Sequence, residues 1–196
     1  LLVTEKSKNY LGIDGVQAYN QAVQVLLFGA DHPVIKNKRA LTAQAPGGTG
    51  SLRIAAEFLV RNTQSKTIWI SSPTWANHKN IFQSASLEIK EYRYYKAETH
   101  DKDFDAMVAD LNTAKVGDLV LFHGCCHNPT GIHLTEEQWY TIAELCLKQQ
   151  LIPLFDFAYQ GFGKGVDEDA NGLRIMANTV PELLIANSFS KNFGLS

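Results

Sequence analysis

Short apolar runs alternate along this chain with segments whose apolar residues repeat at helical spacing. Four runs, bounded by polar or turn-forming residues, have the length and composition of buried strands; they cover residues 67–70, 118–122, 151–155 and 183–186. Runs as apolar as these suit a parallel sheet that is covered on both faces. The pattern therefore predicts a sheet whose strands are separated by helices.

Three segments between or before these runs have helical character. Residues 16–28 are amphipathic, residues 51–60 are rich in helix formers, and Thr135 with Gln138 forms a capping box that predicts a helix through about Lys148. The alternation predicts an α/β fold in three layers, with a mostly parallel central sheet and functional loops at the carboxyl ends of the strands. We expect residues 1–37 to form an N-terminal arm and helix, and residues 38–196 the main domain.

Charge and composition narrow the possible partners. The chain of 196 residues has 18 basic and 20 acidic residues, a formal charge of −2, so it has no electrostatic footprint for nucleic acid or an anionic membrane. No apolar stretch is long enough to cross a bilayer. Three cysteines, two of them adjacent at Cys125 and Cys126, indicate reduced thiols and a cytoplasmic protein. A small molecule is the expected partner.

Residues with reactive side chains follow two of the predicted strands. Asp156 comes directly after residues 151–155, where a carboxylate could keep a pyridine nitrogen protonated or simply cap a helix. Tyr159 could place its phenol against the same ligand or belong to the core. Lys191 follows residues 183–186 among uncharged neighbours, and partial burial there would lower the pKa of its amine toward the free base that a Schiff base requires.

A glycine-rich segment, Pro46-Gly47-Gly48-Thr49-Gly50, lies just before the predicted helix at residues 51–60. Glycines let a ligand approach the backbone, and free N–H groups at a helix start attract phosphate. The segment lacks the Gly-Lys-Ser/Thr of a Walker loop and the third glycine of a dinucleotide fingerprint. It is either a phosphate cradle or a plain tight turn.

Three further motifs contain residue types that occur in reactive or binding sites. Ser188-x-x-Lys191 matches a serine-acylase signature, but no Ser-Asp-Asn accompanies it. His123, Cys125, Cys126 and His127 are metal-ligand types, yet adjacent strand residues point to opposite faces and no Cys-x-x-Cys is present, so no metal site is expected. Asn128-Pro129 is a turn signal whose prolyl bond is a candidate for the cis form.

Taken together, four ordered motifs resemble the class I pyridoxal-phosphate-dependent aminotransferases, most closely their bacterial aspartate aminotransferase branch. The motifs are Gly47-Gly48-Thr49-Gly50, His127-Asn128-Pro129-Thr130-Gly131, Asp156-Phe157-Ala158-Tyr159 and Ser188-Phe189-Ser190-Lys191. The resemblance runs through nearly the whole chain. It implies the large domain of the fold-type I transferases, a small domain that lies beyond Ser196, and a homodimer with a shared active site.

The resemblance also assigns roles at the site of the cofactor, pyridoxal 5′-phosphate. Lys191 would form the Schiff base and act as general base and acid; Asp156 would pair with the pyridine nitrogen, supported by His78. Tyr159 and Asn128 would hydrogen-bond the phenolic oxygen of the ring. The other expected contacts are Trp75 on the ring face and, at the phosphate, Gly48, Thr49, Ser188, Ser190 and the neighbouring subunit's Tyr10. Trp75 and Asn128 would also contact the substrate.

The implied activity is ping-pong transfer of an amino group from L-aspartate to 2-oxoglutarate, which gives oxaloacetate and L-glutamate. An aromatic-amino-acid aminotransferase is the nearest alternative, and a non-catalytic regulatory domain that binds pyridoxal phosphate is the alternative from another class. The arginines expected to bind the substrate carboxylates and the phosphate would lie beyond Ser196. We therefore expect these 196 residues alone to be inactive.

Overall fold

The computed structural model of the chain describes residues 9–194. They divide into two compact units, with the boundary between Gln44 and Ala45. The expected arm and helix, residues 1–37, lie within the first unit, and residues 1–8 of the arm are outside the described residues. No helix in the described part is both long and apolar enough to cross a membrane.

The first unit contains two helices, α1 (Gln17–Phe28) and α2 (Pro33–Lys36). The apolar stripe expected over residues 16–28 buries Val23, Leu27 and Phe28 on one side of α1. Asn20 is also buried because its side-chain amide donates to the carbonyl oxygens of Asp14 (2.8 Å) and Thr42 (3.0 Å). These two bonds tie the helix to the segments before and after it.

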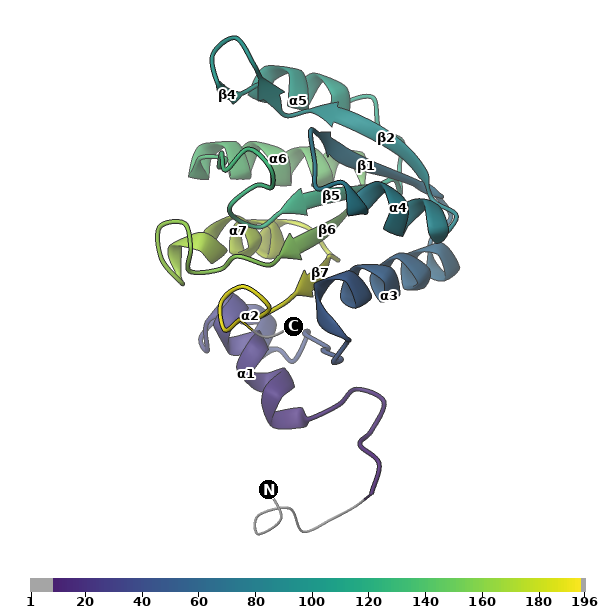
Figure 1. Ribbon diagram of the computed structural model, residues 1–196, viewed down its shortest axis with the longest axis vertical. Helices are drawn as coiled ribbons and strands as arrows, with labels where there is room; N and C mark the ends of the chain where they lie inside the picture. The colour runs from purple at the N-terminus through teal and green to yellow at the C-terminus, as the bar shows by residue number, and fades with distance from the viewer. Residues whose placement is uncertain (1–8, 195–196) are drawn as a thin grey trace. The chain divides into compact units, whose positions relative to one another are not determined.

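The second unit is built on a sheet of five parallel strands in the order β2-β1-β5-β6-β7 (Figure 1). The strands are β1 (Thr67–Ser72), β2 (Glu88–Arg93), β5 (Leu119–His123), β6 (Ile152–Phe157) and β7 (Leu184–Asn187). The helices are α3 (Gly47–Asn62), α4 (Asn77–Ser84), α5 (Phe104–Leu111), α6 (Glu136–Gln149) and α7 (Asn171–Thr179), with a 3₁₀ turn at Glu168–Ala170. A helix connects every strand to the next, as parallel strands require. A short antiparallel pair, β3 (Tyr95–Lys96) and β4 (Asp101–Lys102), lies outside this sheet.

The pleat of the strands separates two apolar layers. Leu119 and Leu121 of β5 and Leu154 of β6 pack with α3 and α4 in one core cluster. The next residue of each strand, Phe122 or Phe155, points to the other face and contacts Trp139 of α6, with ring centroids 5.8 Å and 5.7 Å from the indole. The sheet is therefore covered on both faces, and the predicted three-layer α/β fold is confirmed.

The four predicted strands and three predicted helices are present, with ends shifted by a few residues. Strand β2 was missed because its sequence, Glu-Ile-Lys-Glu-Tyr-Arg, is largely polar at the edge of the sheet, where only Tyr92 is fully buried. The helices α4, α5 and α7 have eight or nine residues each, which is too short for a clear apolar repeat. Helix α3 begins at Gly47, inside the glycine-rich segment and not after it.

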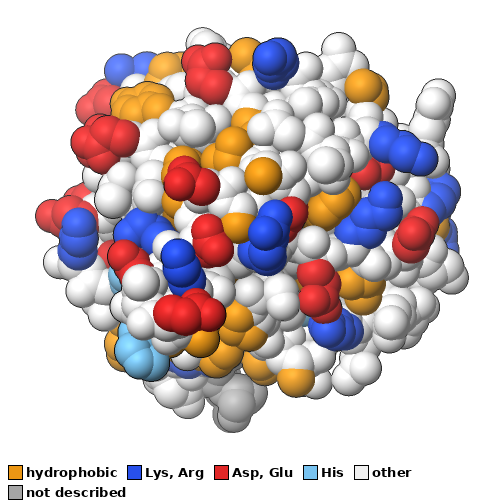
Figure 2. Space-filling model, turned by 90° about the horizontal axis from the view of Figure 1, so that it is seen from above, with side chains coloured by type: hydrophobic (Ala, Val, Ile, Leu, Met, Phe, Trp, Pro, Cys, Tyr) orange, Lys and Arg blue, Asp and Glu red, His pale blue; other side chains and the backbone are white. Residues whose placement is uncertain are grey.

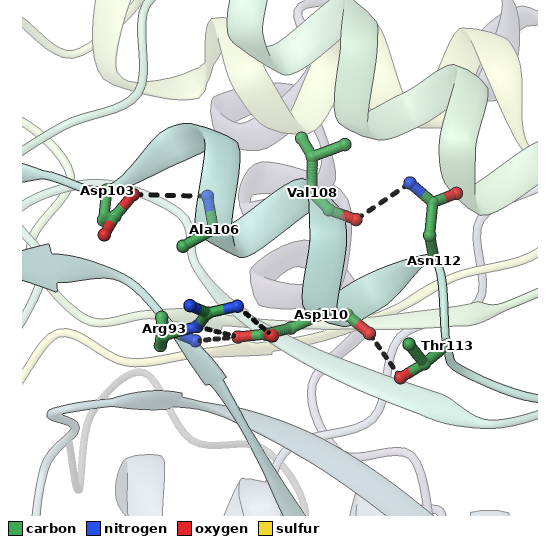
Figure 3. A network of polar contacts seen from close by, with 7 residues as sticks. All are labelled: Arg93, Asp103, Ala106, Val108, Asp110, Asn112 and Thr113. Atoms are coloured by element: carbon green, nitrogen blue, oxygen red, sulfur yellow. Dashed lines mark hydrogen bonds and ion pairs between the residues drawn. The ribbon is translucent and has the colours of Figure 1, made fainter.

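A polar network joins the end of β2 to α5 (Figure 3). The Arg93 guanidinium donates to both carboxylate oxygens of Asp110 (2.7 and 2.9 Å), and the Arg93 backbone N–H donates to the same carboxylate. Asp103 caps the start of α5 by accepting from the Ala106 N–H. On the molecular face shown in Figure 2, acidic and basic side chains are interspersed and form no large area of one sign, as the balanced composition predicts.

Candidate active site

A buried acid and imidazole pair lies at the carboxyl end of β6. Asp156 is the fifth residue of this strand and points to the same side as Leu154, toward α4. There the Nε2 atom of His78, a fully buried residue of α4, lies 2.9 Å from the Asp156 carboxylate. Because an ionised carboxylate only accepts hydrogen bonds, Nε2 is the donor. The Thr74 hydroxyl at 2.7 Å from Nδ1 completes the chain and fixes the ring.

Two more histidines, His123 and His127, lie beside this pair, and the sequence assigned neither of them a role at the cofactor. The His123 ring lies between those of His78 and His127, with centroids 5.2 Å and 4.2 Å away. Neither ring nitrogen of His123 has a hydrogen-bond partner among the described residues. Burial, and then the neighbouring His127 and His78, hold the pKa of His123 well below its usual value, so this imidazole is neutral.

His127 is fixed on the other side of the sheet end. Its Nε2 lies 2.8 Å from the Ser71 hydroxyl, its Nδ1 lies 2.9 Å from the Thr130 hydroxyl, and its ring stacks on Tyr94 at 4.0 Å. Burial is the main cause that lowers the pKa of His127 to about 3. A rigid, neutral His127 therefore begins the turn that carries Asn128, and the Asn128-Pro129 bond is cis, as the turn signal suggested.

The start of α3 and the loop after β7 approach each other closely. A Cβ atom on Gly48 would lie 3.2 Å from the Ser188 hydroxyl oxygen, a tight contact that the glycine avoids. Ser188 is buried, and its hydroxyl has no hydrogen-bond partner in the described part of the chain. The helix has no side-chain cap and no acidic residue in its first turn. Such a helix start can accept a phosphate.

Lys191 and Tyr159 meet at the same site. The Lys191 Nζ atom lies 5.2 Å from the centre of the Tyr159 ring, in a cation–π contact. The expected partial burial of Lys191 is wrong for this chain, in which the residue is exposed. The reason is its place in a loop after β7, the edge strand of the sheet.

The serine-acylase alternative also loses support, because the Ser188 hydroxyl makes no hydrogen bond that could activate it.

One cavity of about 200 Å³ collects most of the predicted site. Nine of the eleven candidate residues line it: Gly48, Thr49, Trp75, Asn128, Asp156, Tyr159, Ser188, Ser190 and Lys191. His78 lies behind Asp156, and Tyr10 belongs to the first unit, where it is fully exposed. His123 and Cys125 also line the cavity and were not expected there. Their signal in the sequence was the run from Phe122 to His127, which belongs to the family resemblance but from which no cofactor contact at His123 or Cys125 was predicted.

Comparisons with known proteins agree with this arrangement. The model of the family "Aminotransferase class I and II" matches residues 1–196. The chain is 58% identical over 195 residues to the aspartate aminotransferase of Escherichia coli (strain K12), covering all of this chain and 49% of that protein. It is 45% identical over 186 residues to the aromatic-amino-acid aminotransferase of the same strain, covering 95% of this chain and 47% of that protein.

A solved aminotransferase structure also has the same fold as this chain. The aromatic-amino-acid aminotransferase from Burkholderia pseudomallei, covalently bound to pyridoxal phosphate, superimposes with a TM-score of 0.95 at 42% identity, over 99% of this chain and 49% of that one. The chain thus spans about half the length of the relatives it matches. With a parallel sheet, a polar cavity at its carboxyl edge and a family match along its whole length, the chain belongs to the class I and II aminotransferases.

Proposed function

We propose that the protein containing this chain is a pyridoxal-phosphate-dependent aminotransferase that acts on L-aspartate and 2-oxoglutarate. The observation that carries the proposal is the single cavity in which the amine of Lys191, the carboxylate of Asp156 and the open start of α3 occur together. The identity of 58% to an aspartate aminotransferase, against 45% to an aromatic one from the same organism, supports aspartate as the substrate.

The residues present fit this cofactor. Its phosphate requires hydrogen-bond donors. The buried Ser188 hydroxyl, which has no partner among the described residues, and the free N–H groups at the uncapped start of α3 can provide them. The absence of a side chain at Gly48 leaves room beside Ser188. Thr49 and Ser190 line the same cavity and add two hydroxyl groups. When bound, pyridoxal phosphate supplies an aldehyde that forms a Schiff base and a protonated ring that accepts the electrons of a carbanion.

The acidic end of the cavity is suited to the pyridine nitrogen. The His78 bond leaves Asp156 with free acceptor positions, since an ionised carboxylate has about four lone-pair sites. The imidazole, fixed from behind by Thr74, holds the carboxylate in one orientation. Asp156 can therefore accept the N–H of a protonated ring and keep it protonated.

The remaining residues position the reacting groups. Lys191 is the only lysine at the cavity among the described residues, and we assign it both the bond to the cofactor and proton transfer at the substrate α-carbon. Tyr159 and Asn128 line the same cavity and can donate to the phenolic oxygen of the ring, while Trp75 offers a flat surface that restricts its tilt. Trp75 and Asn128 would also contact the substrate.

We further propose a homodimer in which the partner subunit's Tyr10 reaches the phosphate. The exposure of Tyr10 in one subunit leaves its hydroxyl available for such a contact. The arginines for the substrate carboxylates would come from the part of the protein that these residues do not cover, because the chain spans about half of its relatives. On this basis the 196 residues alone would not support turnover.

The test uses the full-length protein. Reduction with borohydride in the presence of pyridoxal phosphate, followed by peptide mapping, should label Lys191 in the wild type and in Lys164→Ala, a control at a lysine outside this cavity. The Lys191→Ala variant should lose both this label and amino transfer. Equal labelling of several lysines, or full turnover in Lys191→Ala, would reject the assignment.

An aromatic-amino-acid aminotransferase is the second candidate, because the solved structure with a TM-score of 0.95 bears that name. The ratio of kcat/KM for aspartate to that for phenylalanine separates the two. A ratio well above one supports aspartate, and a ratio below one supports the aromatic alternative. Cofactor binding without turnover of either amino acid would indicate a regulatory binding domain.

A further inference from the structure

A second, larger cavity of about 620 Å³ opens beside the end of β5. His123 and Cys125 line both this cavity and the smaller one, so they form a common wall between the two. Cys126 and Asp169 line only the larger cavity. None of the roles proposed above uses either cysteine or Asp169.

The sulfur atoms of Cys125 and Cys126 point to the same cavity although the residues are adjacent. In a strand they would point to opposite faces, which is why the sequence argued against a metal site here. Strand β5, however, ends at His123, and Cys126 has a left-handed backbone with a φ of 46°. Its sulfur therefore turns to the side of Cys125, and both lie within 4.8 Å of each other and of an Asp169 carboxylate oxygen.

Asp169 is held in a fixed position far along the chain from the cysteines. Its carboxylate accepts three backbone N–H groups, from Gly161 and Gly163 on Oδ2 and from Lys164 on Oδ1, at 2.8–2.9 Å. An ionised carboxylate has about four lone-pair sites, so one site on Oδ1 remains. Asp169 is 7% exposed, and it thus offers a preorganised oxygen ligand.

We propose that Cys125, Cys126 and Asp169 form a binding site for a soft divalent metal ion such as Zn²⁺ or Cd²⁺. Thiolate sulfur is the preferred ligand of these ions. Zinc–sulfur bonds of about 2.3 Å in a tetrahedral site put two sulfurs about 3.8 Å apart, within the 4.8 Å spacing observed here. Two thiolates and one carboxylate bind the ion, two thiol protons leave to solvent, and water from the cavity takes the fourth position.

Another group of potential ligands, His78, His123 and Asp156, belongs to the cavity already assigned to the cofactor. The cysteine site is separate from it and does not depend on the proposed aminotransferase activity. A bound ion would nevertheless lie close to the cofactor cavity, because Cys125 lines the common wall and the Cys126 thiol lies 4.0 Å from the Tyr159 carbonyl oxygen.

The experiment titrates the full-length protein with Cd²⁺ and follows the ultraviolet charge-transfer absorption of cadmium thiolates. Cys146 provides the matched control, since it is the third cysteine of this chain and is buried in α6. Wild type and Cys146→Ser should show the same band, and Cys126→Ser should lose it or bind at least tenfold more weakly. Cys126 is only half-buried, so this variant should keep the wild-type thermal midpoint.

A second measurement needs no substitution. Cd²⁺ should slow the alkylation of Cys126 by N-ethylmaleimide, as mapped by mass spectrometry, and a chelator should restore the original rate. Protection of Cys126 together with the loss of the band in Cys126→Ser supports the site. An unchanged alkylation rate, or an equal band in Cys126→Ser and wild type, overturns it.

Discussion

Replacement of Asp118 tests how much the hydrogen bonds of one buried carboxylate contribute to the stability of the second unit. Asp118 directly precedes β5 and is 2% exposed. Its carboxylate accepts the Ser65 hydroxyl (2.6 Å), the Trp69 indole N–H (3.0 Å) and the Lys115 backbone N–H (3.0 Å). The side chain thus joins the α3–β1 connection, strand β1 and the turn before β5.

Asp118→Ala removes three hydrogen bonds to a charged acceptor. Bonds of this kind contribute about 1.5–3 kcal/mol each, but water can replace the acceptor for Ser65 and Lys115, which are not buried. The Trp69 indole is 6% exposed and would be left without an acceptor. We expect a total loss of about 4 kcal/mol for Asp118→Ala and about 1–2 kcal/mol for Asp118→Asn, which keeps one acceptor oxygen.

Thermal unfolding of the wild type and of both variants measures the effect. At roughly 2–4 °C per kcal/mol for a chain of this size, Asp118→Ala should lower the midpoint by about 8–16 °C. Trp69→Phe, which removes only the indole donor, serves as a control and should show a smaller loss. Equal losses in Asp118→Ala and Asp118→Asn, or a loss below about 1 kcal/mol in both, would refute the reasoning.

The stabilisation that these hydrogen bonds provide should decrease as the pH falls. Burial alone would raise the pKa of Asp118, but the bonds from Ser65, Trp69 and Lys115 outweigh it, and the pKa lies below its usual value. Stabilisation from a carboxyl with a lowered pKa is complete above the unfolded pKa and is lost as the pH falls through the folded one. The difference in midpoint between wild type and Asp118→Asn should therefore shrink in acid.

Three further predictions concern other parts of the second unit. Hydrogen bonds from Arg93 lower the pKa of Asp110. In acid titrations followed by circular dichroism, the stability that Asp110→Asn loses at neutral pH should therefore shrink once the pH falls below the ordinary pKa of a carboxyl group, and should disappear only below the lowered pKa of Asp110. Gly124→Ala would put a Cβ 1.7 Å from the Phe157 ring, and overpacking should cost about 1–3 kcal/mol or more in urea unfolding. Ser188→Ala should weaken pyridoxal phosphate binding about tenfold in an absorbance titration, through loss of one charge-assisted hydrogen bond, while unchanged affinity would contradict a phosphate contact.

The sequence was most informative where burial is complete. The runs at residues 118–122 and 151–155 are apolar at every position between their ends because two helical layers cover them, so their strands could be predicted. The edge strand β2 has one face open to solvent and carries Lys90 and Glu91, so its sequence resembles a loop. The expected position of Asp156 at the carboxyl end of a central strand depended on the same apolar run.

Contacts between distant segments were beyond the reach of local patterns. The His78 bond to Asp156 joins residues 78 positions apart, and only the family resemblance had suggested it. The convergence of Cys126 with Asp169 depends on one left-handed backbone angle and on a loop folded around three N–H bonds. Neither feature leaves a periodic signal. The glycine-rich segment indicated only that some group could approach the backbone closely, and the structure places Ser188 beside Gly48.

The alternating pleat of β6 determines where the chain can tolerate insertions and deletions. Asp156 faces α4 and Phe157 the opposite layer, so the loss of one residue upstream within β6 would exchange their sides and present an aromatic ring to His78. A point substitution in this strand changes one side chain, but a one-codon deletion moves every side chain on one side of the deletion to the opposite face of the sheet. Libraries that vary the length of this protein should therefore place their changes in exposed turns, and keep the spacing between Ile152 and Asp156 constant.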